Sequence, residues 1–256
     1  MRPDRPIPRL VLLGLLPALP GCNITSYFST VASEALLLGV ADPVEGVDLG
    51  AAATATTFLA KAQSLDSVAA NVFDDADRVW IEGGGGEAEL PNQGDGLYLA
   101  TSEDDADLVY ADGSRYTLHV QNGGKSYSVG GEAPPPPQLD GVPAPPATHA
   151  AGTQLVVDLS GQGFDNFVGV VADSDGNLTW DSRPEDAGGY VDWIRDSGEV
   201  TTVTVPGSAF PDPGQPYVLG LAGVVKAPDA DFEGFNPLVS NFALGSLAVA
   251  TVTTAP

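Results

Sequence analysis

Apolar and polar residues alternate over short runs along most of the chain after Ala52. The clearest run is residues 116–121, in which every second residue is apolar. A period of two places alternate side chains on one face, so this run predicts a half-buried β-strand. Asn122-Gly123 then supplies residues that adopt positive φ, which predicts a tight hairpin with a return strand over residues 125–129.

Further strands are predicted where β-branched, aromatic and aliphatic residues run up to a turn residue. These runs are residues 54–60, 78–82, 87–90, 97–101, 154–159, 167–172, 177–180, 200–205, 217–225 and 246–252. Only residues 64–68 resemble a capped helical turn, and no stretch sustains the apolar spacing of an amphipathic helix. Since parallel sheets need long crossover connections, usually helices, we expect an all-β protein of antiparallel sandwiches.

Proline marks the clearest boundary in the chain. Pro134–Pro137 cannot donate ladder hydrogen bonds and favour a stiff polyproline II spacer. We therefore expect two β-sandwich domains, residues 51–132 and 148–256, joined by a Pro-rich linker over residues 133–147. Residues 22–50 are expected to form an N-terminal tether, and the apolar run at residues 34–40 within it fits either a strand or one helical turn.

The first residues follow a different pattern. Arg2, Arg5 and Arg9 precede an apolar run over residues 10–19, after which come small residues and Cys22. This is the layout of a secretory signal, which we assign to residues 1–21. The apolar run is about half of the ~20 residues that a membrane-spanning helix needs, so export fits better than a helical anchor.

Residues Leu19-Pro20-Gly21-Cys22 resemble a bacterial lipobox. The resemblance implies cleavage before Cys22 and thioether attachment of diacylglycerol to its sulfur, with three acyl chains, palmitate among them, on the mature protein. One acyl chain binds membranes only marginally, whereas three would hold the protein stably. Asn23, rather than aspartate, follows the cysteine, which implies the outer membrane of a gram-negative bacterium. The alternative is an ordinary signal peptide with an incidental cysteine.

Charge narrows the range of partners. The chain has 10 Lys and Arg against 34 Asp and Glu, a formal net charge of −24 at pH 7. Residues 1–21 hold three arginines and one aspartate, so the cleaved chain carries −26. This balance argues against nucleic acid as a partner and against electrostatic docking to anionic headgroups. Cys22 is the only cysteine, so no intrachain disulfide can form.

Two tyrosines follow glycine-containing turns at the start of apolar strands, in residues 112–116 and 213–217. This arrangement resembles the tyrosine corner of immunoglobulin-like and fibronectin type III-like sandwiches. Residues 95–98 are similar to the Gly-x-Tyr strand start of such modules. The chain thus resembles bacterial surface lipoproteins with tandem β-sandwich domains, a resemblance that implies a fold and no activity.

The chain has only two histidines, His119 and His149. His119 is predicted on the polar side of its strand and His149 in the linker. No Gly-x-Ser-x-Gly nucleophile elbow accompanies either, and the chain has too few Cys and His for a zinc site. We expect both to be solvated, and neither to be catalytic.

Residues 173–177, followed by Thr179 and Asp181, are the best metal candidate, because calcium favours alternating oxygen ligands. Glycine stands fourth in this run, however, where an EF-hand loop has it sixth. An Asp175-Gly176 hairpin turn accounts for the same residues and is the preferred interpretation. The acidic clusters at residues 74–77 and 103–107 are interpreted as solvated loops, with weak cation binding as the alternative.

Trp180, Tyr190 and Trp193, bracketed by Asp181 and Asp192, could form an aromatic platform for sugar rings. Aromatic residues are also ordinary members of a sandwich core, and the alternation at residues 178–180 favours core packing for Trp180. Nothing in the spacing of the carboxylates selects a pair for glycoside hydrolysis.

These observations predict a non-catalytic, lipid-anchored cell-envelope protein with no cofactor and no metal. Its β domains would act as a structural, adhesion or recognition module toward a protein or glycan at the cell surface. The alternative is a carbohydrate- or calcium-dependent binding module that uses the second domain.

Overall fold

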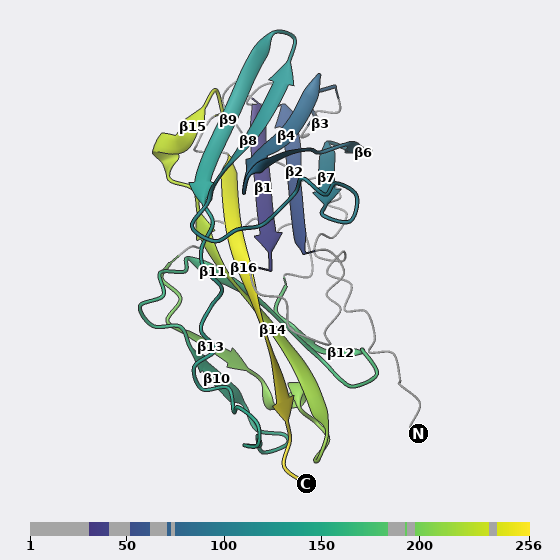
Figure 1. The fold of residues 1–256 in the computed structure, drawn as a ribbon, viewed down its shortest axis with the longest axis vertical. Coiled ribbons are helices and arrows are strands. Elements are labelled where there is room, and N and C mark those ends of the chain that lie inside the picture. Colours follow the sequence, from purple (N-terminus) through teal and green to yellow (C-terminus); the bar gives the residue numbers. More distant parts are fainter. Residues whose placement is uncertain are drawn as a thin grey trace.

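The computed structural model describes residues 31–40, 52–61, 71–72, 75–183, 193, 198–235 and 240–256 (Figure 1). Apart from the helical residue Trp193 and short turns such as the 3-10 helices Gly207–Ala209 and Asp229–Asp231, the regular structure of these residues consists of strands. The expected all-β class is therefore confirmed. The predicted signal peptide, Cys22 and the predicted helical turn at residues 64–68 lie outside the described residues.

The largest sheet that the structure describes has nine strands. Its order is β12 (Leu178–Asp181), β11 (Asn166–Ala172), β14 (Pro216–Lys226), β16 (Asn241–Thr253), β1 (Val31–Gly39), β2 (Ala53–Lys61), β7 (Leu97–Thr101) and β6 (Asn92–Gly94), with β3 (Asn71–Val72) paired to β2. The two longest strands, β14 and β16, pair along the whole length of β14 and run through both halves of the molecule (Figure 1).

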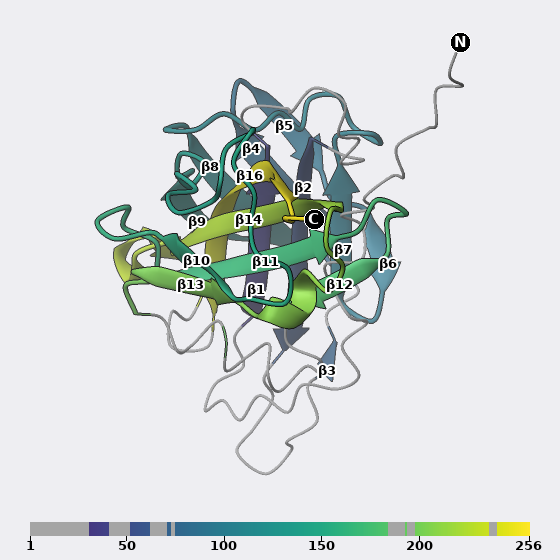
Figure 2. The ribbon, with the colours of Figure 1, turned by 90° about the horizontal axis from the view of Figure 1, so that it is seen from below.

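Two smaller sheets complete the fold. The first has the order β15 (Phe232–Glu233), β9 (Lys125–Glu132), β8 (Arg115–Asn122), β4 (Arg78–Gly83) and β5 (Gly86–Glu89). The second pairs β10 (Leu155–Asp158) with β13 (Thr202–Val205) and lies over β11 and β14 (Figure 2). Nearly all of the predicted runs are strands, with bounds shifted by a few residues.

Two apolar cores join these sheets face to face. The first lies between the five-stranded sheet and one part of the nine-stranded sheet, and includes Ile81 and Leu118 from the former and Leu37 and Leu244 from the latter. The second joins the β10–β13 pair to β11 and β14. Each half is thus two layers of sheet packed on a shared apolar interior, which is the sandwich principle.

Strand β1 lies in the middle of the nine-stranded sheet. It pairs antiparallel with β2 and parallel with β16, in a register that runs from Glu34 opposite Asn241 to Gly39 opposite Ser246. The expectation of purely antiparallel sheets is therefore wrong at this pair. Nothing in the sequence indicates this parallel pair, because β1 and β16 lie near opposite ends of the chain and are not joined by a single crossover helix.

The apolar run in β1 has side chains buried on both faces of the sheet. Leu37 belongs to the first core, whereas Leu36 and Leu38 belong to a third cluster on the opposite face. Burial on both faces explains a continuous apolar run without alternation. Of the two interpretations of residues 34–40, the strand is confirmed, and residues 31–39 of the predicted tether are part of the folded body.

The Pro-rich segment does not separate two independent sheets. Ala133 is buried in the first core, and the Tyr110 hydroxyl donates a hydrogen bond of 2.9 Å to the carbonyl oxygen of Pro134. Leu139 and Val142 pack against the second core. Residues 133–147 therefore lie against the body, and the strands on either side of them meet in the shared nine-stranded sheet, so the division into two separate sandwiches is not confirmed.

The predicted hairpin between β8 and β9 is confirmed, with its turn shifted by one residue. Asn122 and Lys125 are the last paired residues, and Gly123 (φ 55°) and Gly124 (φ 76°) occupy the turn. Two successive positive φ values match the twist of the flanking strands, and glycine adopts them without strain.

Both predicted tyrosine corners make the expected contact with upstream backbone. The Tyr116 hydroxyl donates to the carbonyl oxygen of Val109 at 2.6 Å and accepts from the N–H of Ala111 at 2.8 Å. The Tyr217 hydroxyl accepts from the N–H of Asp212 at 3.0 Å. Each ring is buried, so each corner fixes the loop before its strand to the core.

Candidate functional site

The outer face of the five-stranded sheet carries the most distinctive cluster of polar and aromatic side chains. Along β4, Val79 and Ile81 point into the core, which leaves Arg78, Trp80 and Glu82 on the outer face. The direct neighbour of Trp80 on β8 is His119. The prediction that His119 lies on the polar side of its strand is therefore confirmed.

Trp80 is the centre of a stack of three side chains. The His119 ring lies parallel to the indole, with ring centroids 4.8 Å apart and an interplanar angle of 10°. The guanidinium carbon of Arg78 lies 4.5 Å from the indole centroid. Arg78 also donates to Glu87 at 2.6 Å and lies 3.7 Å from Glu89, both on β5.

These contacts place two partners against the indole. Strands β8 and β5 flank β4 on opposite sides; His119 comes from β8, and the guanidinium of Arg78 is paired with carboxylates of β5. The indole is therefore engaged by side chains of its own sheet. We name Arg78, Trp80 and His119 the outer-face stack. Its contacts hold side chains of the neighbouring strands β4 and β8 in place on the outer face of the sheet.

The His119 ring is less solvated than the sequence suggested. Its side chain is 26% exposed, and Nε2 lies 3.6 Å from Oε2 of Glu82. Burial lowers the pKa of His119 below its ordinary value of 6.5, and the nearby carboxylates of Glu82 and Glu87 oppose that shift only in part. The expectation of a solvated histidine is therefore wrong for His119, because stacking on Trp80 removes water from the ring.

His149 has a structural place at the lower end of the molecule. Its N–H donates to the carbonyl oxygen of Thr253 at 2.8 Å, and its own carbonyl accepts from Ala255 at 2.7 Å. Its ring meets Phe210 edge-on at 5.0 Å. His149 thus ties the start of the C-terminal half to the end of β16.

The loop at residues 173–177 is organised by its own hydrogen bonds. One carboxylate oxygen of Asp173 accepts from the N–H groups of Asp175 at 2.9 Å and of Asn177 at 2.8 Å. The Asn177 side chain donates to the second oxygen at 3.0 Å. Hydrogen bonding from Asn177 lowers the pKa of Asp173, and Gly176 adopts a φ of 84°. The turn therefore engages both carboxylate oxygens of Asp173, the first of the candidate calcium ligands.

The acidic clusters also make local hydrogen bonds. Asp77 accepts from the N–H of Gly123 at 2.7 Å, and Asp104 accepts from the Thr101 hydroxyl at 2.8 Å. In the described parts of the chain, no group of three or more His, Cys, Asp or Glu side chains is arranged to hold a metal ion.

Two members of the candidate aromatic platform, Trp180 and Trp193, pack in different places. Trp180 packs partly buried against the second core, with its ring over Gly169. Trp193 packs against the third cluster on the other face of the sheet, and its indole N–H donates to the carbonyl oxygen of Phe167 at 3.2 Å. The two tryptophans therefore belong to different clusters. Tyr190 and Asp192 lie outside the described residues.

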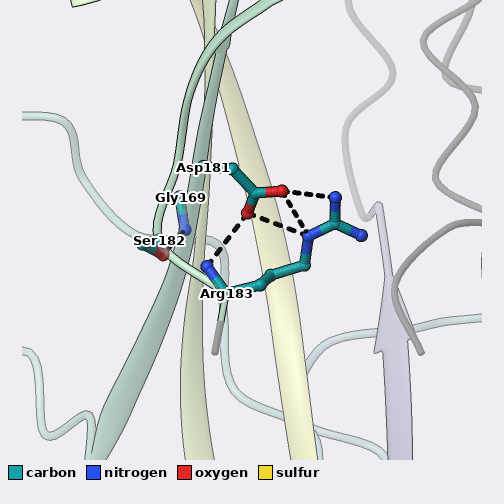
Figure 3. Close-up of polar contacts among 4 residues, drawn as sticks. All are labelled: Gly169, Asp181, Ser182 and Arg183. Atoms are coloured by element: carbon teal, nitrogen blue, oxygen red, sulfur yellow. Dashed lines mark hydrogen bonds and ion pairs between the residues drawn. The ribbon is translucent and has the colours of Figure 1, made fainter. Parts of the chain in front are cut away.

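Asp181 and Arg183 form a compact ion pair at the end of the edge strand β12 (Figure 3). The guanidinium of Arg183 donates three hydrogen bonds to the two carboxylate oxygens, and the backbone N–H of Arg183 adds a fourth at 2.9 Å. Beside the pair, the Ser182 hydroxyl accepts from the N–H of Gly169 at 2.7 Å. Burial would raise the pKa of Asp181, but its hydrogen bonds to Arg183 lower it, so this carboxylate is engaged in the strand end rather than open to a calcium ion.

The outer-face stack was missed at the sequence level. The sequence pattern placed His119 on the polar side of its strand, which was a usable signal, but it assigned no face to Trp80, because residues 79–81 are all apolar. What was missing was the pairing register, without which no sequence pattern says that the two rings lie side by side.

Cys22 lies outside the described residues, and so does the predicted signal peptide. Within the part of the chain that the structure describes, no helix is long and apolar enough to cross a membrane. A comparison with protein-family models found no match to this chain, and a comparison with curated proteins found none either.

Proposed function

We propose that this chain is a non-catalytic protein of a gram-negative cell envelope, held at the outer membrane by acyl chains on Cys22. Its β body serves as a structural, adhesion or recognition module. The observation that carries the proposal is the layout of residues 1–22, in which basic, apolar and small residues lead to the only cysteine in the chain.

The fold is compatible with this role. The sandwich-like body buries its strands in apolar cores, and its tyrosine corners resemble those of immunoglobulin-like and fibronectin type III-like modules. We propose the same kinship for the fold, in a form where the two sandwich halves share β14 and β16. A strongly acidic chain would stay soluble and resist self-association when displayed from a membrane.

The alternative is a carbohydrate- or calcium-dependent binding module in the C-terminal half. Two observations weigh against it. Trp180 and Trp193 pack on separate clusters, and the Asp173 carboxylate is bonded within its own turn. Calorimetry with calcium and a glycan array test this alternative, and binding of either ligand that is lost on Trp180→Ala or Asp173→Asn would support it.

The main test is the intact mass of the protein extracted from membranes. We expect a chain that begins at Cys22 and carries the added mass of three acyl chains. Cys22→Ser removes the thiol and should abolish both cleavage and acylation, whereas the nearby Ser26→Ala should change neither. A native chain that carries no lipid and still begins at Met1 would refute the proposal.

Sorting gives a second readout. Aspartate after the lipidated cysteine implies retention at the inner membrane, so Asn23→Asp should move the protein from the outer- to the inner-membrane fraction. An unchanged distribution of both forms between the two fractions would contradict the outer-membrane assignment while leaving acylation intact.

A further inference from the structure

The distance along the chain between the proposed anchor and the folded body is short. Only residues 23–30 separate Cys22 from Val31, the first residue of β1. An extended chain advances at most ~3.3–3.6 Å per residue, so the start of β1 lies within roughly 30 Å of the acylated sulfur. A body connected this closely has one end near the bilayer.

The direction of β1 decides which end that is. Val31 pairs with Lys61 at the end of β2, and Glu34 pairs with Asn241 at the start of β16. Strand β1 begins at the end of the molecule that also holds β3 and the β8–β9 turn, and it runs toward the middle (Figure 1). We call this the β1-start end.

The other end of the molecule extends well beyond β1. Strand β16 is 13 residues long, and only Asn241–Ser246 pair with β1. At about 3.4 Å per residue, β16 carries the C-terminal end roughly 40 Å from the level of Glu34, near the start of β1. That far end holds the β10–β13 sheet and the residues around Thr253 (Figure 1).

Charge does not choose between the two ends. Of the 10 Lys and Arg, three precede Cys22, and among the seven that follow, Lys61, Arg78 and Lys125 stand at the β1-start end by register. Exposed Asp75 and Asp77 stand at the same end, and Arg78 is paired with Glu87 and Glu89. Because the far half also exposes carboxylates, Asp158 and Asp212 among them, the short connection to Cys22 decides the direction.

We infer that the β1-start end of the sandwich rests against the lipid headgroups of the membrane that holds Cys22, and that the β10–β13 end faces away. In this orientation, β14 and β16 run roughly along the membrane normal. This orientation rests on the proposed acylation of Cys22, and it leaves the β10–β13 end as the surface that a partner meets first.

Energy transfer from single labels to the bilayer tests this orientation. Cys22 is the only cysteine and is blocked when acylated, so one introduced cysteine can be labelled alone. Ser126→Cys marks the β8–β9 turn, Ser114→Cys the middle of the molecule and Ser208→Cys the far end beside the end of β16. The three substitutions are near-isosteric and serve as controls for one another.

The acylated protein is inserted into phosphatidylethanolamine–phosphatidylglycerol vesicles that contain an acceptor on the lipid headgroup. We expect transfer to fall in the order 126, 114, 208, with a several-fold loss between the first and the last, given the ~40 Å length of β16. Equal transfer from the three positions would mean that the body lies flat, and the reverse order would mean that it is inverted; either result overturns the inference.

Flotation of the same vesicles separates the two proposals. A protein that floats with the vesicles but gives equal or reversed transfer refutes the orientation and leaves the lipid anchor standing. A protein that carries no acyl mass and does not float refutes the anchor, and the orientation with it.

Discussion

Replacing Leu37 by alanine tests whether residues 31–39 belong to the body. Leu37 is fully buried, pairs with Leu244 of β16 on one side and with Ala55 of β2 on the other, and belongs to the first core. If this segment were part of a tether, truncation of one side chain would leave the stability of the body unchanged.

The magnitude follows from burial. Leu→Ala in a packed core costs about 2–5 kcal/mol, which is the transfer free energy of the lost methyl groups plus the cost of the remaining cavity. Leu37 lies in the centre of a nine-stranded sheet, where neighbouring strands cannot close a gap freely, so we expect about 3 kcal/mol or more. For a chain of this size that corresponds to a fall in Tm of roughly 6–12 °C.

The assay is urea and thermal unfolding of the chain without residues 1–22, with circular dichroism as the signal that monitors unfolding. Leu178→Ala is the matched control, because Leu178 lies on the edge strand β12 and is 50% exposed, so its loss should cost about 0.5 kcal/mol or less. Equal unfolding midpoints for the parent and Leu37→Ala would refute the placement of β1 in the core.

Three further predictions follow from the contacts. Tyr116→Phe should cost about 1–3 kcal/mol and more than Tyr217→Phe, because the first removes two hydrogen bonds to backbone and the second removes one; equal losses in urea unfolding would contradict this. Residues 23–137 alone should show no cooperative unfolding, because they lack β16, the parallel neighbour of β1; a sharp transition would mean that the N-terminal half folds independently. Burial lowers the pKa of His119 in the folded state, so its contribution to stability is present above pH 6.5 and is lost as the pH falls from 6.5 toward that lower pKa. The parent should therefore lose more unfolding free energy than His119→Gln between pH 7 and pH 5. Parallel plots of unfolding free energy against pH for the two proteins would refute this.

Local patterns in the sequence determined most of the strands. Alternation at residues 116–121 places Tyr116 inside and His119 outside, because side chains alternate across a strand whatever lies next to it. The β8–β9 turn was predictable for the same reason, since Gly123 needs a positive φ that other residues resist. The tyrosine corners are local too, with hydroxyl and backbone partners within a few residues of each other.

Pairing between distant segments was decided by the tertiary structure alone. β1 contacts β16 across about 200 residues, and no residue within the run 34–40 encodes that partner. Its continuous apolar side chains fitted a strand or a helical turn equally well until the sheet buried both faces. The contacts of residues 133–147 were also beyond the sequence, because the low hydrogen-bonding capacity of proline says nothing about whether Ala133 or Leu139 meets an apolar core.

The outer-face stack shows the same limit at the level of side chains. The sequence indicated that His119 faces outward but left the face of Trp80 open, and only the register of β4 against β8 brings the rings to 4.8 Å. Alternation fixes the face of each residue because it depends on one backbone. Contact between residues depends on two backbones and their alignment, which is set by the burial of the whole sheet.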